Sequence, residues 1–214
     1  LKKPMINVGK SVQHYLVITK NIFVPMVKNI FESKISDLIH IEKNFLSKKL
    51  CEKIINEYDD QDIQREVRDH MPDRKLSRTY VSSREVINRK NSYERKKIDI
   101  ELVEVLRSSL KIYIQNVWKD FTFNQDQGFC LNKMIKGDGY NEHVDNVPGT
   151  SCDWKMTLVY LLNDDFQGGD FTVHKVDQKL KQGDLIMFPS YWMFPHGIKT
   201  VTKGSRYSLI TWAW

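Results

Sequence analysis

The decisive stretch of this sequence is Gly137-Asp138-Gly139-Tyr140-Asn141-Glu142-His143-Val144-Asp145, which is followed far downstream by Pro195-His196 and by Arg206-Tyr207-Ser208. A bare His-x-Asp pair occurs by chance in many proteins, but a second histidine and then an arginine in strand-like sequence make the pattern specific. Two imidazoles and one carboxylate can occupy one face of an Fe(II) ion and leave three positions open. His143, Asp145 and His196 are therefore predicted to bind one metal ion.

The spacing of these residues predicts how a β-sheet would bring them together. Successive strand residues point to opposite faces, so His143 and Asp145 are expected to share a face. His196 must come from a different strand that lies alongside, and Arg206 is expected on the strand after it. The planar guanidinium of arginine can hold a carboxylate at two points. The alternative, unrelated polar side chains in loops, leaves the whole combination unexplained.

The second half of the chain has the pattern of an all-β barrel or jelly roll. From Phe129 onward, short apolar or alternating runs are separated by turn residues every eight to twelve positions. The expected turns include one before the first candidate ligand, one before the strand that ends at Phe188-Pro189, and a hairpin before Arg206. With a fourth turn between two other strands, Gln167-Gly168-Gly169, the expected turns in chain order are Gly137-Asp138-Gly139, Gln167-Gly168-Gly169, Gly183-Asp184 and Lys203-Gly204.

Helices are expected before this β-rich part. Residues 41–46 are predicted to form a strand, and Ser47 is predicted to cap a helix. The apolar residues of that helix, Leu50, Ile54, Ile55 and Tyr58, recur at helical spacing. A second helix is expected from about residue 99 to 118. Both should support the barrel from outside, which gives a mainly β fold with flanking helices, of the α+β class.

Composition favours one catalytic-sized domain in a reducing compartment. The chain has 214 residues and is 41% hydrophobic, which is enough for a sizeable core. Its three cysteines, Cys51, Cys130 and Cys152, form no C-x-x-C pair, which favours a cytoplasmic or other reducing intracellular location. No apolar run approaches the roughly 20 residues needed to cross a bilayer, and no cleavable signal pattern is present. Because the chain begins with leucine, we expect it to be trimmed.

The charge is concentrated between the two expected helices. Residues 59–97 are rich in arginine and lysine, and long loops of this kind are often functional lids. We therefore predict a substrate lid at 59–97, within a domain that spans 38–214 after an extension at 1–37. The net charge of +6 raises the question of nucleic acid, but the basic residues alternate with acids and no nucleic-acid-binding motif appears. A polypeptide of acidic character fits this charge better.

At the residues quoted above, the sequence resembles the 2-oxoglutarate/Fe(II) oxygenases, and within them the prolyl-hydroxylase-like branch. The likeness runs from about Ile39 to Trp214. Besides the first quoted stretches it rests on Leu158-Val159-Tyr160-Leu161-Leu162-Asn163, Gly168-Gly169-Asp170-Phe171 and Gly183-Asp184-Leu185-Ile186-Met187-Phe188, in the same order as in the family.

The resemblance implies a double-stranded β-helix, or jelly roll, supported by N-terminal helices. It also implies that the metal is Fe(II) and that no catalytic residue is needed beyond the three metal ligands. Arg206 would bind the distal carboxylate of 2-oxoglutarate, Tyr160 would assist it, and Ser208, on the same face, would add a hydrogen bond. The implied cofactors are Fe(II), 2-oxoglutarate and O2, with ascorbate as a further candidate.

The sequence departs from the family pattern at three places. The family often has a tyrosine on the strand before the Gly-x-Gly turn, where this chain reads Asn132-Lys133-Met134-Ile135. Enzymes that hydroxylate collagen-type proline often use lysine where this chain has Arg206. The branch that repairs nucleic acid tends to carry a second arginine six residues later, where this chain has Trp212. These differences argue against nucleic acid and leave the collagen-type substrate without support.

Three further residues have two interpretations each. Tyr140 can touch substrate or pack under the glycine turn. Asn146 can hold the second oxygen of Asp145 or a backbone group, or it can simply favour a turn. Trp212 can form a wall of the metal site or belong to the core.

The implied activity is hydroxylation of a C–H bond with release of succinate and CO2, most simply on a prolyl or other residue of a protein or peptide. Two alternatives stay open at this point. One is a hydroxylase of free amino acids or other small molecules, and the other is a catalytically silent, cupin-like binding module.

Overall fold

The computed structural model of this protein describes residues 34–59, 77–81, 93–146 and 153–214. Within them, Leu38–Trp214 belong to one compact unit. Residues 1–33 of the predicted extension, and residues 60–76 and 82–92 of the predicted lid, lie outside the described part. A short 3-10 helix, η1 (Ile35–Leu38), precedes the first strand. The division into an extension, a domain and a lid stays a prediction.

The larger of two main sheets, called the large sheet here, has six strands in the order β1-β9-β5-β12-β3-β2. Each pair of neighbours in it is antiparallel. Its strands are β1 (His40–Glu42), β2 (Ser77–Val81), β3 (Phe129–Ile135), β5 (Met156–Leu161), β9 (Leu185–Pro189) and β12 (Ser205–Ala213).

The small sheet has four strands in the order β4-β10-β7-β8, again antiparallel. A two-stranded ribbon pairs β11 with β6. The strands of these two sheets are β4 (Tyr140–His143), β6 (Gln167–Gly168), β7 (Phe171–Val173), β8 (Val176–Gln178), β10 (His196–Ile198) and β11 (Val201–Lys203).

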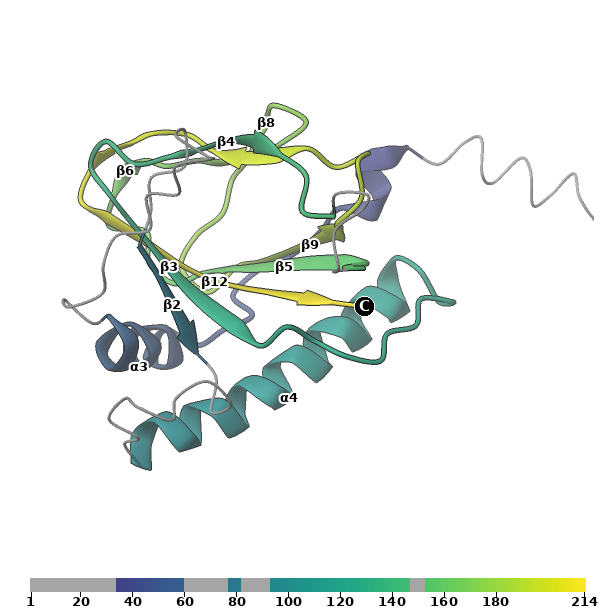
Figure 1. Ribbon diagram of the computed structural model, residues 1–214, viewed down its shortest axis with the longest axis horizontal. Coiled ribbons are helices and arrows are strands. Elements are labelled where there is room, and N and C mark those ends of the chain that lie inside the picture. Colours follow the sequence, from purple (N-terminus) through teal and green to yellow (C-terminus); the bar gives the residue numbers. More distant parts are fainter. Residues whose placement is uncertain (1–33, 60–76, 82–92, 147–152) are drawn as a thin grey trace, which may run out of the picture. The chain divides into compact units, whose positions relative to one another are not determined.

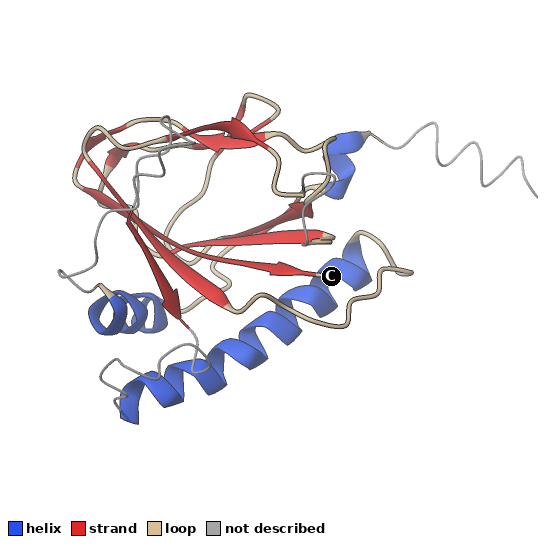
Figure 2. Ribbon diagram, viewed as in Figure 1, coloured by secondary structure: helices blue, strands red, loops and turns tan. Residues whose placement is uncertain are grey.

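The elements form three layers, with the large sheet in the middle (Figures 1 and 2). The helices α3 and α4 lie on one side of it and the small sheet lies on the other. One apolar cluster joins Val159 and Ile210 of the large sheet to Phe171 and Val173 of the small sheet. A second cluster joins the opposite face of the large sheet to the helices. The structure confirms the predicted mainly β architecture with supporting helices.

Both helices form where the apolar spacing predicted them. In α3 (Lys48–Tyr58), Ser47 is the N-cap, and its hydroxyl accepts a hydrogen bond of 3.2 Å from the backbone N–H of Leu50. The buried residues of α3 and of α4 (Tyr93–Asn116) recur every three or four positions, so each helix turns one apolar stripe toward the large sheet. In α4 they are Ile98, Leu102, Leu106, Ser109, Leu110 and Tyr113.

Two predicted boundaries were wrong. The strand expected at 41–46 is only β1, which ends at Glu42. Asp184 accepts hydrogen bonds from Lys43 Nζ (2.8 Å) and from the backbone N–H of Asn44 (2.9 Å), and Asn44 has a φ of +53°. These contacts turn the chain into α3. The second helix, expected from 99 to 118, begins at Tyr93 and ends at Asn116.

The predicted hairpin at Lys203-Gly204 was also wrong. The strands on either side of Gly204, β11 and β12, pair with different partners, β6 for the first and β3 and β5 for the second. Gly204, with a φ of +77°, therefore carries the chain from the two-stranded ribbon to the large sheet. Arg206, expected on the strand directly after that of His196, lies instead on the second strand after it, because β11 comes between β10 and β12 in the sequence.

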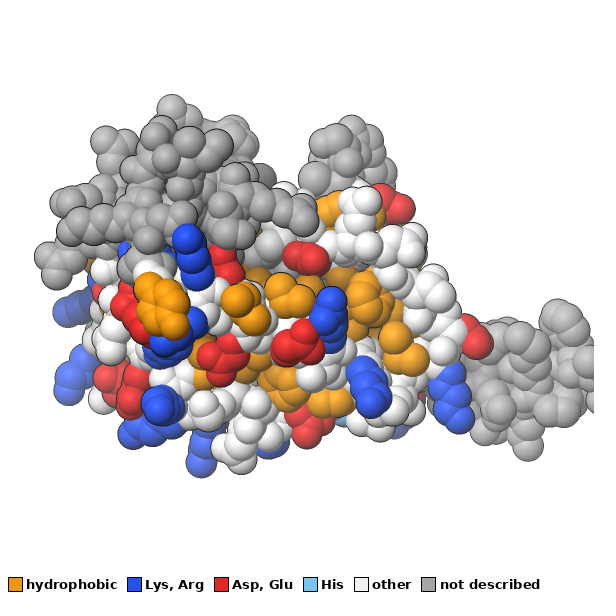
Figure 3. Space-filling view, turned by 90° about the horizontal axis from the view of Figure 1, so that it is seen from below, with side chains coloured by type: hydrophobic (Ala, Val, Ile, Leu, Met, Phe, Trp, Pro, Cys, Tyr) orange, Lys and Arg blue, Asp and Glu red, His pale blue; other side chains and the backbone are white. Residues whose placement is uncertain are grey.

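The outer surface on the α4 side carries exposed apolar side chains set among charged ones (Figure 3). On α4, Ile100 and Val103 are exposed, and the helix also carries the ion pair Glu104–Arg107. Among the described residues, no helix has the length and apolar character that a membrane crossing requires.

Gly183, at the turn before β9, gives the first prediction. Its φ is +86°, and an added Cβ would collide with the backbone oxygen of Leu46. Gly137 has a similar φ of +89°, but an added Cβ there meets nothing within 4 Å. Gly137→Ala should cost about 1–2 kcal/mol for the left-handed conformation, and Gly183→Ala should lose clearly more in the free energy of unfolding, measured with urea. Equal losses would contradict the close approach of this turn to Leu46.

Candidate metal centre

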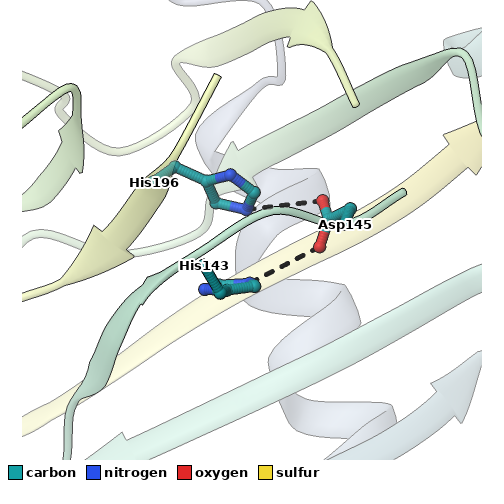
Figure 4. A group of neighbouring side chains, drawn as sticks. All are labelled: His143, Asp145 and His196. Atoms are coloured by element: carbon teal, nitrogen blue, oxygen red, sulfur yellow. Dashed lines mark ion pairs between the residues drawn. The ribbon is translucent and has the colours of Figure 1, made fainter. Parts of the chain in front are cut away.

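The three predicted ligands meet at the β4–β10 edge of the small sheet (Figure 4). The two strands pair with His143 directly opposite His196, and the centroids of the two imidazole rings are 4.3 Å apart. One ligand atom from each of His143, Asp145 and His196 lies within 4.8 Å of the others. Asp145 lies two residues beyond the end of β4, so strand alternation alone does not aim its carboxylate.

Backbone carbonyls fix the orientation of both imidazoles. His143 Nδ1 donates to the carbonyl of Asn141 at 3.0 Å, and His196 Nδ1 donates to that of Phe194 at 3.1 Å. The Nε2 atoms face Asp145, at 3.5 Å from Oδ1 for His143 and at 3.3 Å from Oδ2 for His196. Metal-binding histidines commonly donate their other N–H in this way. Nε2 of each ring is therefore the atom presented to a metal.

The carboxylate of Asp145 is held by two side chains of the large sheet. Its Oδ2 accepts hydrogen bonds from the Thr157 hydroxyl on β5 (2.7 Å) and from the Trp212 indole N–H on β12 (2.8 Å). Burial acts to raise the pKa of Asp145, but the charge of His196 and the hydrogen bonds to both imidazoles hold this pKa well below its usual value. The site therefore presents an ionised carboxylate to a cation.

Aromatic rings surround the two imidazoles. Tyr140 stacks on His143 with ring centroids 3.8 Å apart. His196 is almost fully buried, and its ring lies 4.8 Å from that of Phe188 and 5.8 Å from that of Phe171. The packing limits rotation of both ligand side chains. For Tyr140 it favours the packing interpretation, with the ligand ring as the surface it packs on.

Arg206 is a buried cation that lacks an ion-pair partner among the described residues. Its Nε donates to the carbonyl of Gly169 at 3.0 Å, and its Nη1 donates to the Ser208 hydroxyl at 2.9 Å. Burial lowers the pKa of Arg206 to about 10, with Asp170 acting in the opposite direction, so the guanidinium stays charged at neutral pH. A buried charge is costly unless it is paired. This side chain therefore suits an anionic ligand.

Tyr160, predicted to assist Arg206, lies on the opposite face of the large sheet from Arg206. On β12, Leu209 packs in the cluster under the helices, whereas Ile210 packs in the cluster between the two sheets. Arg206 is four residues before Ile210 on the same strand, so both side chains point to the face between the two sheets. Tyr160, by contrast, packs in the cluster under the helices. The Tyr160 hydroxyl lies 2.8 Å from the Ser109 hydroxyl of α4. It supports the helix and not the guanidinium.

The other predicted neighbours have definite contacts. Ser208 accepts from Arg206, and Trp212 contacts the ligand Asp145 directly. Asn146 holds a backbone group and not the second oxygen of Asp145, because its side-chain amide donates to the carbonyl of Trp154 at 2.9 Å.

Two residues of the site were not predicted. They are Thr157 and Gly169, which contact Asp145 and Arg206 respectively. The available signal for Thr157 was a single threonine in a run, Met156–Leu161, whose other residues are all hydrophobic or aromatic.

A second prediction follows from this ligand set. His143→Ala and Asp145→Ala should each abolish tight binding of Fe(II) or its substitute Co(II), because a two-ligand site holds these ions poorly. Isothermal titration calorimetry would measure the affinity, and circular dichroism would verify that the fold persists. His174→Ala, at an exposed turn between β7 and β8, is the control and should bind metal normally. Full affinity in both ligand variants would remove the metal assignment.

Comparison with known proteins agrees with this geometry. The sequence profile of the 2OG-Fe(II) oxygenase superfamily matches residues 129–214. A PKHD-type hydroxylase of Idiomarina loihiensis is 33% identical over 88 residues, which cover 38% of this chain and 39% of that protein. Prolyl 3-hydroxylase 2 of Homo sapiens is 42% identical over 89 residues, which cover 33% of this chain and 13% of that protein. The matched part thus spans well under half of each relative.

Solved structures share the fold at low sequence identity. A prolyl hydroxylase from Trichoplax adhaerens, in complex with a hypoxia inducible factor peptide fragment, has a TM-score of 0.64 and is 17% identical, over 96% of this chain and 93% of that one. A viral collagen prolyl hydroxylase from Paramecium Bursaria Chlorella virus-1 has a TM-score of 0.60 and is 16% identical, over 82% and 95%. The jelly-roll prediction is confirmed. Residues 129–214 of this chain therefore match the 2OG-Fe(II) oxygenase superfamily, and the similar proteins named above are PKHD-type and prolyl hydroxylases.

Proposed function

We propose that this chain is an Fe(II)- and 2-oxoglutarate-dependent dioxygenase that hydroxylates a prolyl or other residue of a protein or peptide. One oxygen atom of O2 would enter the substrate C–H bond as a hydroxyl group, and the other would enter succinate as CO2 leaves 2-oxoglutarate. One observation carries the proposal. The inner side of the barrel holds both a three-ligand cluster and a buried arginine that has no ion-pair partner among the described residues.

The three ligands fit Fe(II). Two Nε2 atoms and one ionised carboxylate approach from one side, and this set leaves positions open for other ligands. When bound there, Fe(II) supplies the open positions at which a keto acid and O2 react. The contributions of the chain are to hold both imidazoles in one orientation, to keep Asp145 ionised, and to surround His196 with apolar rings.

The surroundings of Arg206 fit the distal carboxylate of 2-oxoglutarate. The contacts with Gly169 and Ser208 leave Nη2 without a hydrogen-bond partner among the described residues. The Ser208 hydroxyl accepts from Nη1 and keeps its own proton, which it can donate to the same carboxylate. Ser208 pairs in register with Leu161 of β5 and Asn132 of β3. With Tyr160 on the other face, the arginine and the serine would bind the carboxylate.

Three observations support a polypeptide substrate. The relatives named above include prolyl 3-hydroxylase 2, and one similar structure is a prolyl hydroxylase with a bound peptide fragment. The net charge of +6 suits an acidic partner. The start of the predicted lid is anchored, since Asp59 accepts hydrogen bonds from Lys133 Nζ at 2.9 Å and from the Tyr207 hydroxyl at 2.6 Å.

Substrate screening tests the proposal. The protein would be incubated with Fe(II), 2-oxoglutarate and ascorbate, and with either proline-containing peptides, of acidic and neutral sequence, or free amino acids. Stoichiometric succinate and a product heavier by one oxygen atom on a peptide are expected. Oxygen addition to free amino acids alone would replace the polypeptide proposal with a small-molecule hydroxylase. Metal binding without any 2-oxoglutarate turnover would indicate a silent binding module.

Substitution of Arg206 gives the third prediction. Arg206→Ala should raise the KM for 2-oxoglutarate about 10- to 100-fold, because a charge-assisted bond is worth roughly 1.5–3 kcal/mol. Arg206→Lys should raise it less, since the charge is kept but the planar fork is lost. Initial rates of succinate formation at varied 2-oxoglutarate would measure both. An unchanged KM in Arg206→Ala would mean that another basic residue binds the carboxylate.

Tyr160→Phe provides a matched test of the opposite face. Because the Ser109 hydroxyl donates to the carbonyl of Val105, the Tyr160 hydroxyl is the donor in their shared bond. Its loss should lower the free energy of unfolding by about 1 kcal/mol. The KM for 2-oxoglutarate should not change. A KM increase similar to that of Arg206→Ala would restore Tyr160 as a cosubstrate contact.

A further inference from the structure

We propose that the hydroxyl groups of Thr157 and Ser190 form a relay that positions Asp145 as a metal ligand through a single oxygen, Oδ1. The inference deepens the proposed function and rests on it in one respect, which is that the cluster binds a metal ion. Thr157 bonds to the ligand Asp145, and Ser190 bonds to Thr157 and to the backbone of Asn146, so both are positioning residues.

The two hydroxyls lie in line behind the carboxylate. Thr157 is on β5, and Ser190 directly follows β9, the strand paired with β5. The Oγ atoms are 2.8 Å apart, and Thr157 Oγ1 lies 2.7 Å from Asp145 Oδ2. Both side chains are buried, with 0% and 1% of their surface exposed. Water therefore does not compete for these bonds in the described structure.

The direction of the relay follows from the hydrogen-bonding capacity of each group. The Thr157 hydroxyl has a single proton, which it donates to Asp145 Oδ2 at 2.7 Å. The Thr157 oxygen is then an acceptor, and Ser190 must be the donor in the bond that joins the hydroxyls. Chains of hydrogen bonds polarise one another in a low-dielectric interior. Ser190 thus strengthens the bond that Thr157 donates.

This arrangement makes the two carboxylate oxygens unequal. Oδ2 accepts from Thr157 and from Trp212, which uses the two lone-pair directions of that oxygen. Among the described residues, no hydroxyl or indole N–H donates to Oδ1, which lies 3.5 Å from His143 Nε2, while Oδ2 lies 3.3 Å from His196 Nε2. The carboxylate is therefore prepared to bind a metal through Oδ1. Removal of the Thr157 hydroxyl would take away one of these two bonds, and the carboxylate could then rotate about the remaining bond to Trp212.

Ser190 also holds the backbone beside the ligand. Its carbonyl accepts from the N–H of Asn146, the residue after Asp145, at 2.9 Å, and its own N–H donates to the carbonyl of Lys155 at 3.0 Å. The end of β9 therefore fixes Asp145 twice, once through the neighbouring backbone and once through the two hydroxyls. The small sheet supplies the histidines, whereas the large sheet sets the angle of the carboxylate.

Thr211 supplies a matched control from the same sheet. It is fully buried, and its hydroxyl has no hydrogen-bond partner within the described part of the chain. It is one residue from Trp212 on β12, so its side chain points to the opposite face from the metal cluster. Thr211→Val is the same chemical change as Thr157→Val, but it removes a hydroxyl that takes no part in the relay.

The experiment measures Co(II) and Mn(II) binding to the full chain by calorimetry, together with the visible absorption spectrum of the Co(II) form. Thr157→Val should weaken metal affinity about 10- to 100-fold, the usual cost of losing a group that orients a metal ligand. It should also change the Co(II) spectrum, because rotation of the carboxylate alters the coordination. Thr157→Ser should restore both, and Thr211→Val should match the wild type.

The relay itself is tested with Ser190→Ala alone and combined with Thr157→Val. Ser190→Ala alone should weaken binding less than Thr157→Val, and it should add nothing once the Thr157 hydroxyl is gone. Additive losses would overturn the relay, and wild-type affinity and spectrum in Thr157→Val would overturn the positioning role. If the wild-type protein bound neither ion, the metal centre itself would fail, which is a distinct result. Thermal unfolding of each variant separates these outcomes from a general loss of structure.

Discussion

The antiparallel register of β4 and β10 is the constraint on which the site depends. It places His143 directly opposite His196, so two residues more than fifty positions apart in the sequence present their rings to the same point. A shift of one residue would turn either side chain to the other face of the sheet. The apolar faces of β7 and β10 pack between the two sheets, which opposes such a shift. Core packing thereby fixes the geometry of the ligands.

The two faces of the large sheet have different roles: side chains on the inner face form the candidate site, and those on the outer face pack against the helices. Arg206, Ser208 and Trp212 share the inner face of β12, whereas Leu209 and Ala213 alternate with them and pack under the helices. Asp145 receives its hydrogen bonds from this inner face although it follows a strand of the small sheet. The buried carboxylate of Asp145 is thus matched to donors of the large sheet, which limits the cost of burying it.

Much of this arrangement could be predicted from the sequence because it depends on local patterns. The ligand spacing, the β-rich second half, the cap at Ser47 and the apolar stripes of the helices are all visible in short windows. Tyr160 was misplaced because every residue of β5 is buried, so alternation of apolar and polar residues gives no sign of its face. The end of β1 depends on Asp184, 140 positions away from Asn44, and no local pattern contains that contact.

The centre also links the two sheets electrostatically. His196 belongs to the small sheet, while Thr157 and Trp212, the donors to Asp145, belong to the large one. Burial acts to lower the pKa of His196, but the Asp145 carboxylate beside it raises that pKa, so the two side chains attract each other. A divalent ion would engage the same three side chains and replace that attraction with direct coordination. Because metal binding to a folded site adds to folding free energy, the same residues that serve the chemistry would also hold the barrel closed.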